Sequence, residues 1–273
     1  MKVIWKYLLL GILVGVFNSL FYLNYWDTNL DLSNIILYLS FGTPLLTVPM
    51  LTEMTIKFFP YIIFQILTGI LFYKHFCTAS IYIFSRCENR GKWFLKEAFN
   101  VLINTLIYCG MLMCSSVFLA SINNNVTVSS KSMWLCFSYL LIYSCWLYIT
   151  IVVINLVNII SSNSCYGFIL VMFFQFACIW LLLIWGNVYK IIQEQYQTKM
   201  FTLLKLNPVS HLVLGWHTSI WSNLNDKINY WNQNFLLINS IVILIIVSII
   251  VTFVGIKLIG KKQIINSAVE GDK

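Results

Sequence analysis

The sequence predicts an all-α polytopic membrane protein, and three observations lead to that prediction. Hydrophobic residues make up 60% of the 273 residues and charged residues 10%, whereas soluble domains average about 45–50% and about 25%. The mean hydropathy is +0.83. The apolar runs, such as 241–253, are continuous, unlike the alternating strands of a transmembrane barrel. This composition excludes a cytosolic enzyme, a disordered chain and a nucleic-acid-binding domain, which would need a basic polar surface.

We expect one membrane domain, residues 1–273, with six transmembrane helices, because each span needs about 20 apolar residues. Lys2 and Lys6 precede an apolar stretch that lacks a small-residue cleavage site, so we expect a retained first helix rather than a signal peptide. The expected spans are 4–23, 57–76, 98–120, 133–159, 166–187 and 235–258.

Residues 35–52 leave two topologies open. They are apolar but contain Pro44 and Pro49, and each proline removes a backbone donor that lipid cannot replace. If they span the membrane there are seven spans; if they form a re-entrant or broken element there are six. With six spans and both termini cytoplasmic, most of the 17 basic residues lie inside, as the positive-inside rule requires. We therefore favour six spans.

The expected loop 77–97 is the most informative polar segment. Arg86 and Arg90 are four residues apart and would share one helix face, and Gly91 permits a turn into the next span. One interpretation is topological, since cytoplasmic loops are basic and tryptophan favours the headgroup level. The other is a docking element for a cytoplasmic partner. Its candidate residues are Ser85, Arg86, Glu88, Arg90, Gly91, Lys92 and Trp93.

A loop reading Ser-Arg-x-x-x-Arg-Gly-Lys-Trp between the second and third of six spans resembles the permease subunits of ABC-2-type bacterial ABC transporters. The resemblance implies that this loop couples to an ATPase subunit, in two copies, which binds ATP and Mg²⁺, and that a second permease, identical or related, completes the transporter. It also implies a bacterial cell membrane location. Permeases of this size resemble those that export bacteriocin- or lantibiotic-like peptides or protect against them. Here only three residues precede Ile4, whereas many relatives carry an amphipathic elbow helix before the first span.

The predicted spans contain polar amides but almost no ionisable groups. A proton- or sodium-coupled transporter needs a titratable or coordinating group near the midplane, so the sequence disfavours ion coupling. The amides either form interhelical hydrogen bonds or line a path for an amphiphilic substrate. Candidate lining residues are Asn104, Asn155, Asn158 and Gln175.

The segment 188–234 is expected to form amphipathic outer helices, either anchored at the membrane face or acting as a lid. Its candidate gate residues are Pro208, Trp216 and Trp221. His211 and His217 would lie about 120° apart on one helix, so we expect no metal pair. The eight cysteines form no Cys-x-x-Cys pattern and are expected to be free thiols.

We expect no catalytic residue and no cofactor in this chain. The run 255–262 nearly matches a phosphate-binding loop, but Lys262 stands where a hydroxyl must bind Mg²⁺. The leading hypothesis is therefore the permease subunit of an ATP-driven exporter. The alternatives are a non-transport immunity or sensor protein, a permease for lipid or polysaccharide, and a membrane-embedded enzyme, for which the spans show no polar catalytic cluster. The expected partners are the ATPase, the second permease and the lipid bilayer, without nucleic acid.

Overall fold

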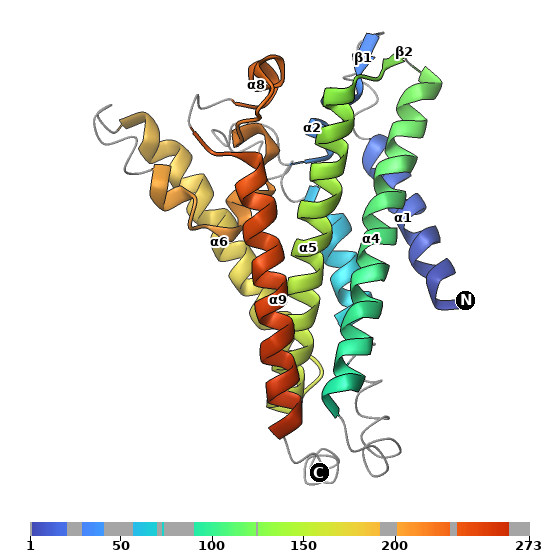
Figure 1. The fold of residues 1–273 in the computed structure, drawn as a ribbon, viewed down its shortest axis with the longest axis vertical. Helices are drawn as coiled ribbons and strands as arrows, with labels where there is room; N and C mark the ends of the chain where they lie inside the picture. The colour runs from blue at the N-terminus through green and yellow to red at the C-terminus, as the bar shows by residue number, and fades with distance from the viewer. Residues whose placement is uncertain are drawn as a thin grey trace. The chain divides into compact units, whose positions relative to one another are not determined.

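The computed structural model describes residues 2–20, 29–40, 57–69, 73, 90–123, 125–191, 201–229 and 234–261, and these are mostly helical (Figure 1). Residues 57–69 are helical but carry no label in Figure 1. The labelled elements are α1 (Lys2–Leu20), β1 (Asn29–Asp31), α2 (Leu32–Leu39), α4 (Arg90–Asn123), β2 (Asn125–Thr127), α5 (Ser130–Ser161), α6 (Tyr166–Ile191), α8 (Ser222–Ile228) and α9 (Leu237–Lys261). Between α6 and α8 lie the 3₁₀ helices η2 (Pro208–Leu212) and η3 (Leu214–Trp216), which carry no label there.

Three helices are long and apolar enough to cross a membrane: Arg90–Ile122, Ser130–Ser161 and Leu237–Gly260. Shorter apolar helices cover Trp5–Leu20 and Tyr166–Leu182. Over the most apolar 18 residues of each helix, 78% of the residues of α5 are buried inside the protein, compared with 28% of those of α9. Thus α5 packs against protein on most sides, whereas most of α9 presents apolar side chains outward, as a lipid-facing helix does. The chain is therefore compatible with a membrane protein.

The described helices fall close to the expected spans, with one notable difference at α4. This helix begins at Arg90, eight residues before the expected span, and continues to Asn123. Gly91 lies in its first turn, and no described glycine has a positive φ. The turn that the sequence predicted at Gly91 is therefore not observed, because the backbone stays helical through it.

The element predicted at 35–52 is described only at its start. Helix α2 ends at Leu39, where the backbone N–H of Ser40 donates to the carbonyl of Ile36. Eight residues rise about 12 Å, which is too short to cross a bilayer. Residues 41–52 lie outside the described residues, so the re-entrant interpretation and the count of six spans stay predictions.

The chain divides into two compact units, and the first comprises Met1–Pro60, Leu106–Ser144 and Gln175–Ile243. In it, α1 packs tightly on α4. A Cβ built on Gly11 would lie 2.8 Å from the carbonyl oxygen of Tyr108, and one on Gly15 would lie 2.6 Å from that of Leu112. The Ser116 hydroxyl donates to the Gly15 carbonyl at 3.2 Å. Two small residues four apart are a common basis of close helix packing in membranes.

A short parallel ladder also belongs to the first unit. β1 pairs with β2 in the register Asn29 with Asn125, Leu30 with Val126 and Asp31 with Thr127, and Figure 1 shows the two strands side by side. The Ser33 hydroxyl donates to the Asp31 carboxylate at 2.7 Å, which ties the start of α2 to the end of β1. The ladder thus connects the chain after α1 with the turn between α4 and α5.

The second unit comprises Tyr61–Thr105, Cys145–Phe174 and Leu244–Lys273. The Gln65 amide donates to the Thr150 hydroxyl at 2.9 Å, which links the 57–69 segment to α5. Gly255 of α9 lies directly on the buried ring of Phe94 in α4. A Cβ at position 255 would clash with that ring, so glycine is what allows α9 to approach the first turns of α4.

Six cysteines lie in the described part of the chain, and none of the six is disulfide-bonded: Cys109, Cys114, Cys136, Cys145, Cys165 and Cys178.

Candidate functional site

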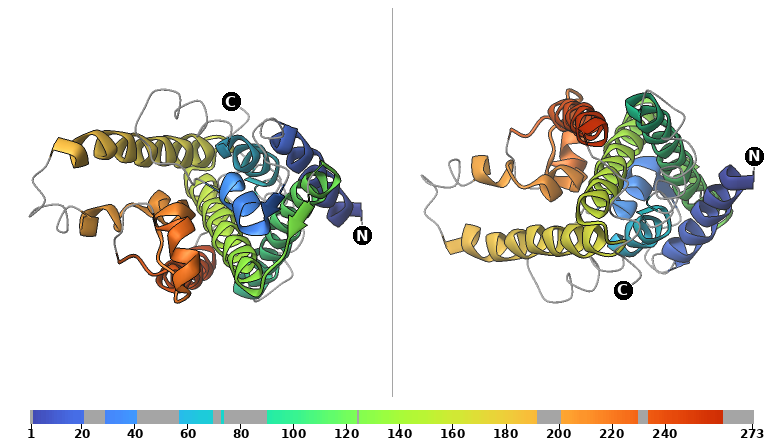
Figure 2. Two further views of the ribbon diagram at one scale, coloured as in Figure 1. Left: turned by 90° about the horizontal axis from the view of Figure 1, so that it is seen from above. Right: turned by 90° about the horizontal axis from the view of Figure 1, so that it is seen from below.

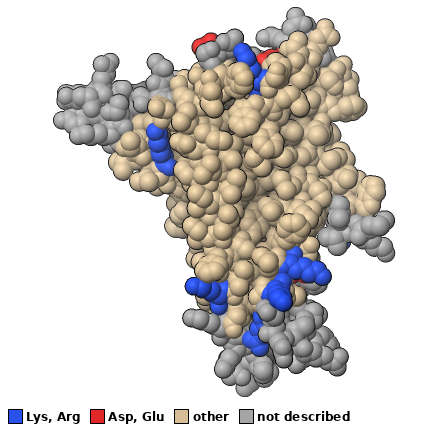
Figure 3. All heavy atoms as spheres, viewed as in Figure 1, with Lys and Arg blue, Asp and Glu red and all other residues tan. Residues whose placement is uncertain are grey.

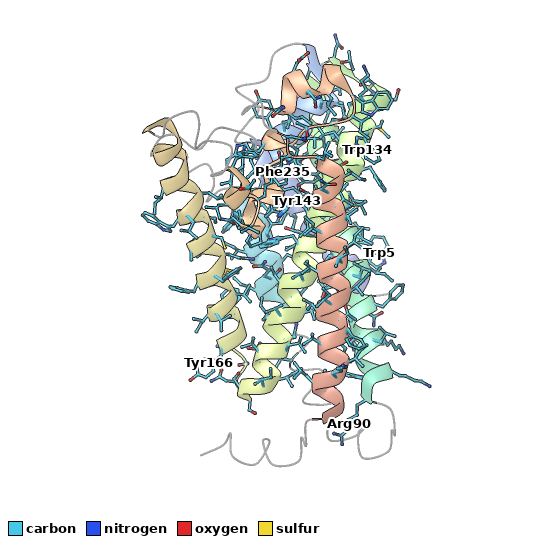
Figure 4. All side chains as sticks on the ribbon, turned by 60° about the vertical axis from the view of Figure 1, so that its left-hand side comes forward. Trp5, Arg90, Trp134, Tyr143, Tyr166 and Phe235 are labelled. Carbon is cyan, nitrogen blue, oxygen red and sulfur yellow. The ribbon has the colours of Figure 1, made fainter. Side chains whose placement is uncertain are left out.

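The predicted coupling residues lie at the start of α4, as far as the structure describes them. Arg90, Gly91, Lys92 and Trp93 form the first turn of this helix, and Figure 4 shows Arg90 at its end. Helix α4 has 34 residues, a length of about 51 Å, against a hydrocarbon core of about 30 Å. Its charged first turns therefore have length to extend beyond a bilayer. Ser85, Arg86 and Glu88 lie outside the described residues.

The predicted lining amides are not gathered at one open surface. Asn155 and Asn158 are 1% and 0% exposed. The Asn155 amide donates to the Ile151 carbonyl of its own helix at 2.7 Å. The Asn158 side-chain oxygen accepts from the backbone N–H of Gly167 at 2.7 Å and so joins α5 to the first turn of α6. For Asn158 this is the interhelical hydrogen bond that the sequence left as one alternative.

The other two predicted lining residues differ from this pair. Asn104 is half-buried on α4 in the second unit. Gln175 on α6 belongs to the first unit and is 2% exposed, and neither polar atom of its side chain has a hydrogen-bond partner among the described residues. A role for any of these amides in lining a pathway stays a prediction.

Asn158 and Asn155 make a matched pair for testing which amide holds helices together. We expect Asn158→Ala to lower the free energy of unfolding by about 1–2 kcal/mol, because it leaves the buried N–H of Gly167 without its acceptor. Asn155→Ala should change it by less than about 1 kcal/mol, because the amide of Asn155 bonds only within its own helix turn and its oxygen has no partner among the described residues. Thermal unfolding in detergent measures both, and equal losses would contradict the assignment.

The described part of the outer segment, residues 201–229, folds into short helices, among them η2, η3 and α8. Asn207 caps η2, since its side-chain oxygen accepts from the Val209 N–H at 2.9 Å, and Pro208 occupies the first helical position, where its missing N–H costs nothing. Of the predicted gate residues, Trp216 is buried in η3 and Trp221 is half-exposed before α8. The Lys131 ammonium lies 6.0 Å from the Trp221 ring centre.

Two histidines of this segment converge on one serine at the start of α9. His211 Nδ1 and His217 Nε2 each lie 2.8 Å from the Ser240 hydroxyl oxygen. Phe235 covers the pair: its ring stacks on His217 at 4.3 Å and meets the edge of His211 at 5.3 Å. Figure 2 shows this segment, in orange, beside the start of α9. We call His211, His217, Ser240 and Phe235 the histidine cluster.

The hydrogen bonds of the histidine cluster define its protons. His211 Nε2 lies 3.0 Å from the Lys205 carbonyl and His217 Nδ1 lies 2.8 Å from the Val213 carbonyl. Carbonyl oxygens only accept, so both of these nitrogens carry a proton. In neutral rings the other two nitrogens are acceptors, and the single Ser240 proton can serve one of them at a time. The Ser240 hydroxyl therefore donates its proton to either His211 or His217. These hydrogen bonds hold the outer segment on α9.

Burial keeps both histidines neutral. It lowers the pKa of His211, against a smaller opposite effect of the hydrogen bond to the Lys205 carbonyl. It lowers the pKa of His217 to about 3, with the Val213 carbonyl opposing and the neighbouring His211 adding to the shift. Ser240 and His217 are both 0% exposed, so the serine hydroxyl does not face solvent as a nucleophile would.

Further contacts anchor the same segment to the first unit. The Tyr143 hydroxyl of α5 donates to the Leu212 carbonyl at 2.8 Å, and the Asn207 amide donates to the Cys178 carbonyl of α6 at 2.9 Å. The Lys205 ammonium donates to the Asn234 carbonyl at 2.5 Å and lies over the Phe235 ring at 5.6 Å. Tyr143 and Phe235 are labelled beside this segment in Figure 4. The segment is thus tied to α5, α6 and α9.

Sequence reasoning missed the histidine cluster because it placed both histidines on one helix. The break between η2 and η3 at Val213 changes their direction, and Ser240 lies in another helix, α9. Within the described residues, no group of three His, Cys, Asp or Glu side chains could hold a metal ion. Comparison of the chain with protein-family models, with curated proteins and with solved structures finds no match.

Proposed function

We propose that the chain is the permease subunit of an ATP-driven transporter that moves an amphiphilic peptide across a bacterial cell membrane. The observation that carries the proposal is the start of α4, where a helix about 51 Å long begins with Arg90, Lys92 and Lys96. These charges and Glu97 stand at one end of the helix, residues 98–123 carry no charge, and a protein outside the membrane can bind that end.

The distribution of charge elsewhere favours an external energy source. Segments of the described helices that contain no Asp, Glu, Lys, Arg or His are 7–20, 58–69, 98–123, 132–161, 166–189 and 237–256. Ion-coupled transporters place such groups near the midplane. Lys57, at the start of the 57–69 helix, is buried. The described stretches without such groups favour transport driven by ATP hydrolysis on a partner subunit, with ATP and Mg²⁺ bound there.

Helix α9 offers a route for the conformational change. In the second unit Gly255 contacts Phe94, one turn from the charged start of α4. In the first unit Ser240 of the same helix holds His211 and His217. In the proposed mechanism, closure of two ATPase subunits displaces the start of α4, α9 moves with it, and the outer segment shifts at its other end. A second permease would complete the path, with both termini of each chain cytoplasmic.

The test is a double charge reversal, Arg86→Glu with Arg90→Glu, in the tagged chain expressed in its native host. Wild-type chain should co-purify with an ABC-type ATPase identified by mass spectrometry, and the complex in liposomes should hydrolyse ATP in a Mg²⁺-dependent manner. We expect the double variant to lose at least about 90% of that activity, because reversed charges repel a surface selected to bind cations.

Lys257→Glu with Lys261→Glu is the matched control, since it reverses two charges at the end of α9 that we place on the same side of the membrane. It should keep the ATPase and most of its activity. Full ATP hydrolysis by the Arg86 and Arg90 double variant, or a purified wild-type chain without any ATPase, would overturn the proposal.

A further inference from the structure

A groove of about 520 Å³ opens in the second unit among α4, α5 and α9. That volume falls within the range of small-molecule sites, about 300–1,000 Å³. Most of the wall comes from one side of α4, and the remainder from one residue each of α5 and α9. The lining residues are Lys92, Leu95, Lys96, Ala98, Phe99, Leu102, Tyr148 and Thr252.

The two hydroxyl groups that line this groove are already hydrogen-bonded within the protein. The Thr252 hydroxyl donates to the Ser248 carbonyl at 2.7 Å, which leaves the Tyr148 hydroxyl to donate to Thr252 at 2.5 Å. Both hydroxyls are thus used within the protein. Leu95 and Phe99 are 50% and 61% exposed, so the rest of the wall presents hydrocarbon. Such a surface favours an aliphatic chain over a water-soluble ligand.

Positive charge stands at one end of the groove. Lys92 and Lys96 are four residues apart and both line the groove, so they lie on the same side of α4. Glu97 is the only acidic residue between 90 and 105. Figure 3 shows lysine and arginine side chains gathered at the end of the molecule where α4 begins. The groove therefore combines a cationic end with an apolar length from Lys92 to Leu102, about 15 Å along the helix.

We propose that this groove binds one anionic phospholipid, with its phosphate between Lys92 and Lys96 and an acyl chain along Leu95, Phe99 and Leu102. Basic pockets between membrane helices recognise acidic headgroups in this way. The direction of α4 matches that of a lipid in a bilayer: charge at the helix start, then hydrocarbon toward its middle. A free phosphate would meet the lysines but leave the apolar wall uncovered. The lipid site uses Lys92 and Lys96, whereas the test of the proposed transport function changes Arg86 and Arg90, so the two proposals can fail separately.

The binding test uses the purified chain in detergent, titrated with dioleoyl phosphatidylglycerol or dioleoyl phosphatidylcholine, with bound lipid counted by native mass spectrometry. We expect one phosphatidylglycerol to bind more tightly than any phosphatidylcholine. Lys92→Gln with Lys96→Gln should weaken it about 30-fold, which corresponds to about 1 kcal/mol for each lysine. Lys257→Gln removes a charge at the same end that does not line the groove, and should change the affinity less than about twofold.

Two further arms separate a lipid site from a site for phosphate alone. Leu95→Trp narrows the groove while keeping both lysines, and should weaken phosphatidylglycerol binding at an unchanged melting temperature. Glycerol 3-phosphate at millimolar concentration, which carries the headgroup chemistry without acyl chains, should neither compete with the lipid nor raise the melting temperature. Any one of four results would overturn the proposal. These are equal binding of the two lipids, an equal loss of binding in the Lys257→Gln control, unchanged lipid binding by Leu95→Trp, and competition by glycerol 3-phosphate.

Discussion

Gly15→Leu is expected to separate α1 from α4 in the first unit. A Cβ at position 15 would overlap the Ser115 hydroxyl and lie 2.6 Å from the Leu112 carbonyl oxygen. Ser115 can change its rotamer, but the Leu112 carbonyl belongs to the backbone of α4 and cannot yield without moving the helix. A leucine adds three more carbon atoms at this contact. The two helices must then move apart, which also breaks the hydrogen bond from Ser116 to the Gly15 carbonyl.

A graded series keeps this prediction measurable even if the leucine variant does not fold. Gly15→Ala adds only the clashing Cβ, and we expect it to lower the free energy of unfolding by about 3 kcal/mol, at the upper end of the range for overpacking. Gly260→Ala is the control, because a Cβ there meets nothing within 4 Å and alanine favours helix by up to about 1 kcal/mol. Thermal unfolding in detergent compares the two. Equal melting temperatures for both alanine variants would show that α1 does not pack on α4 through Gly15.

The sequence predicted those features of the fold that depend on one helix alone. Long apolar runs with charges only at their ends predicted α4, α5 and α9, because a membrane helix satisfies its own backbone and needs only length and hydrophobicity. The expected span begins at Ala98, whereas helix α4 already begins at Arg90. The stretch from Arg90 to Lys96 contains one glycine and three charged residues, a composition typical of a loop. Among these four residues only glycine has a poor helix propensity, and its neighbours are sufficient to keep the helix intact.

Tertiary contacts were beyond the reach of sequence patterns. Gly11 and Gly15 show the spacing of a close helix contact, but nothing in the sequence says that α4 is the partner. Ser240 is one small polar residue in an apolar run, and its role appears only when His211 and His217 meet it. Which residues meet Ser240 depends on the break between η2 and η3. The hydrophobic periodicity of the sequence does not predict that break.

Acidification is expected to release the outer segment from α9. An exposed histidine has a pKa of about 6.5, whereas burial lowers the pKa of His211 and lowers that of His217 to about 3. Below pH 6.5 the histidines of the unfolded segment bind protons, whereas the buried histidines of the folded segment stay neutral. The stabilisation from His217 is therefore fully present above pH 6.5 and is lost as the pH falls toward 3, by about 1.4 kcal/mol per pH unit. His211 adds a loss in the same direction, because its pKa is lowered too.

Hydrogen–deuterium exchange of residues 205–217, followed from pH 7.5 to pH 4.5 with correction for the intrinsic exchange rate, measures this loss directly. We expect protection to fall by at least about tenfold for each pH unit below 6, while the 145–156 stretch of α5 keeps its protection. His211→Gln with His217→Gln removes both titrating rings, so its protection should be lower at pH 7.5 but independent of pH. Wild-type protection that does not change with pH would contradict this prediction. It would mean that Ser240 and the two carbonyls stabilise a protonated histidine, whose extra proton allows both rings to hydrogen-bond to the serine oxygen.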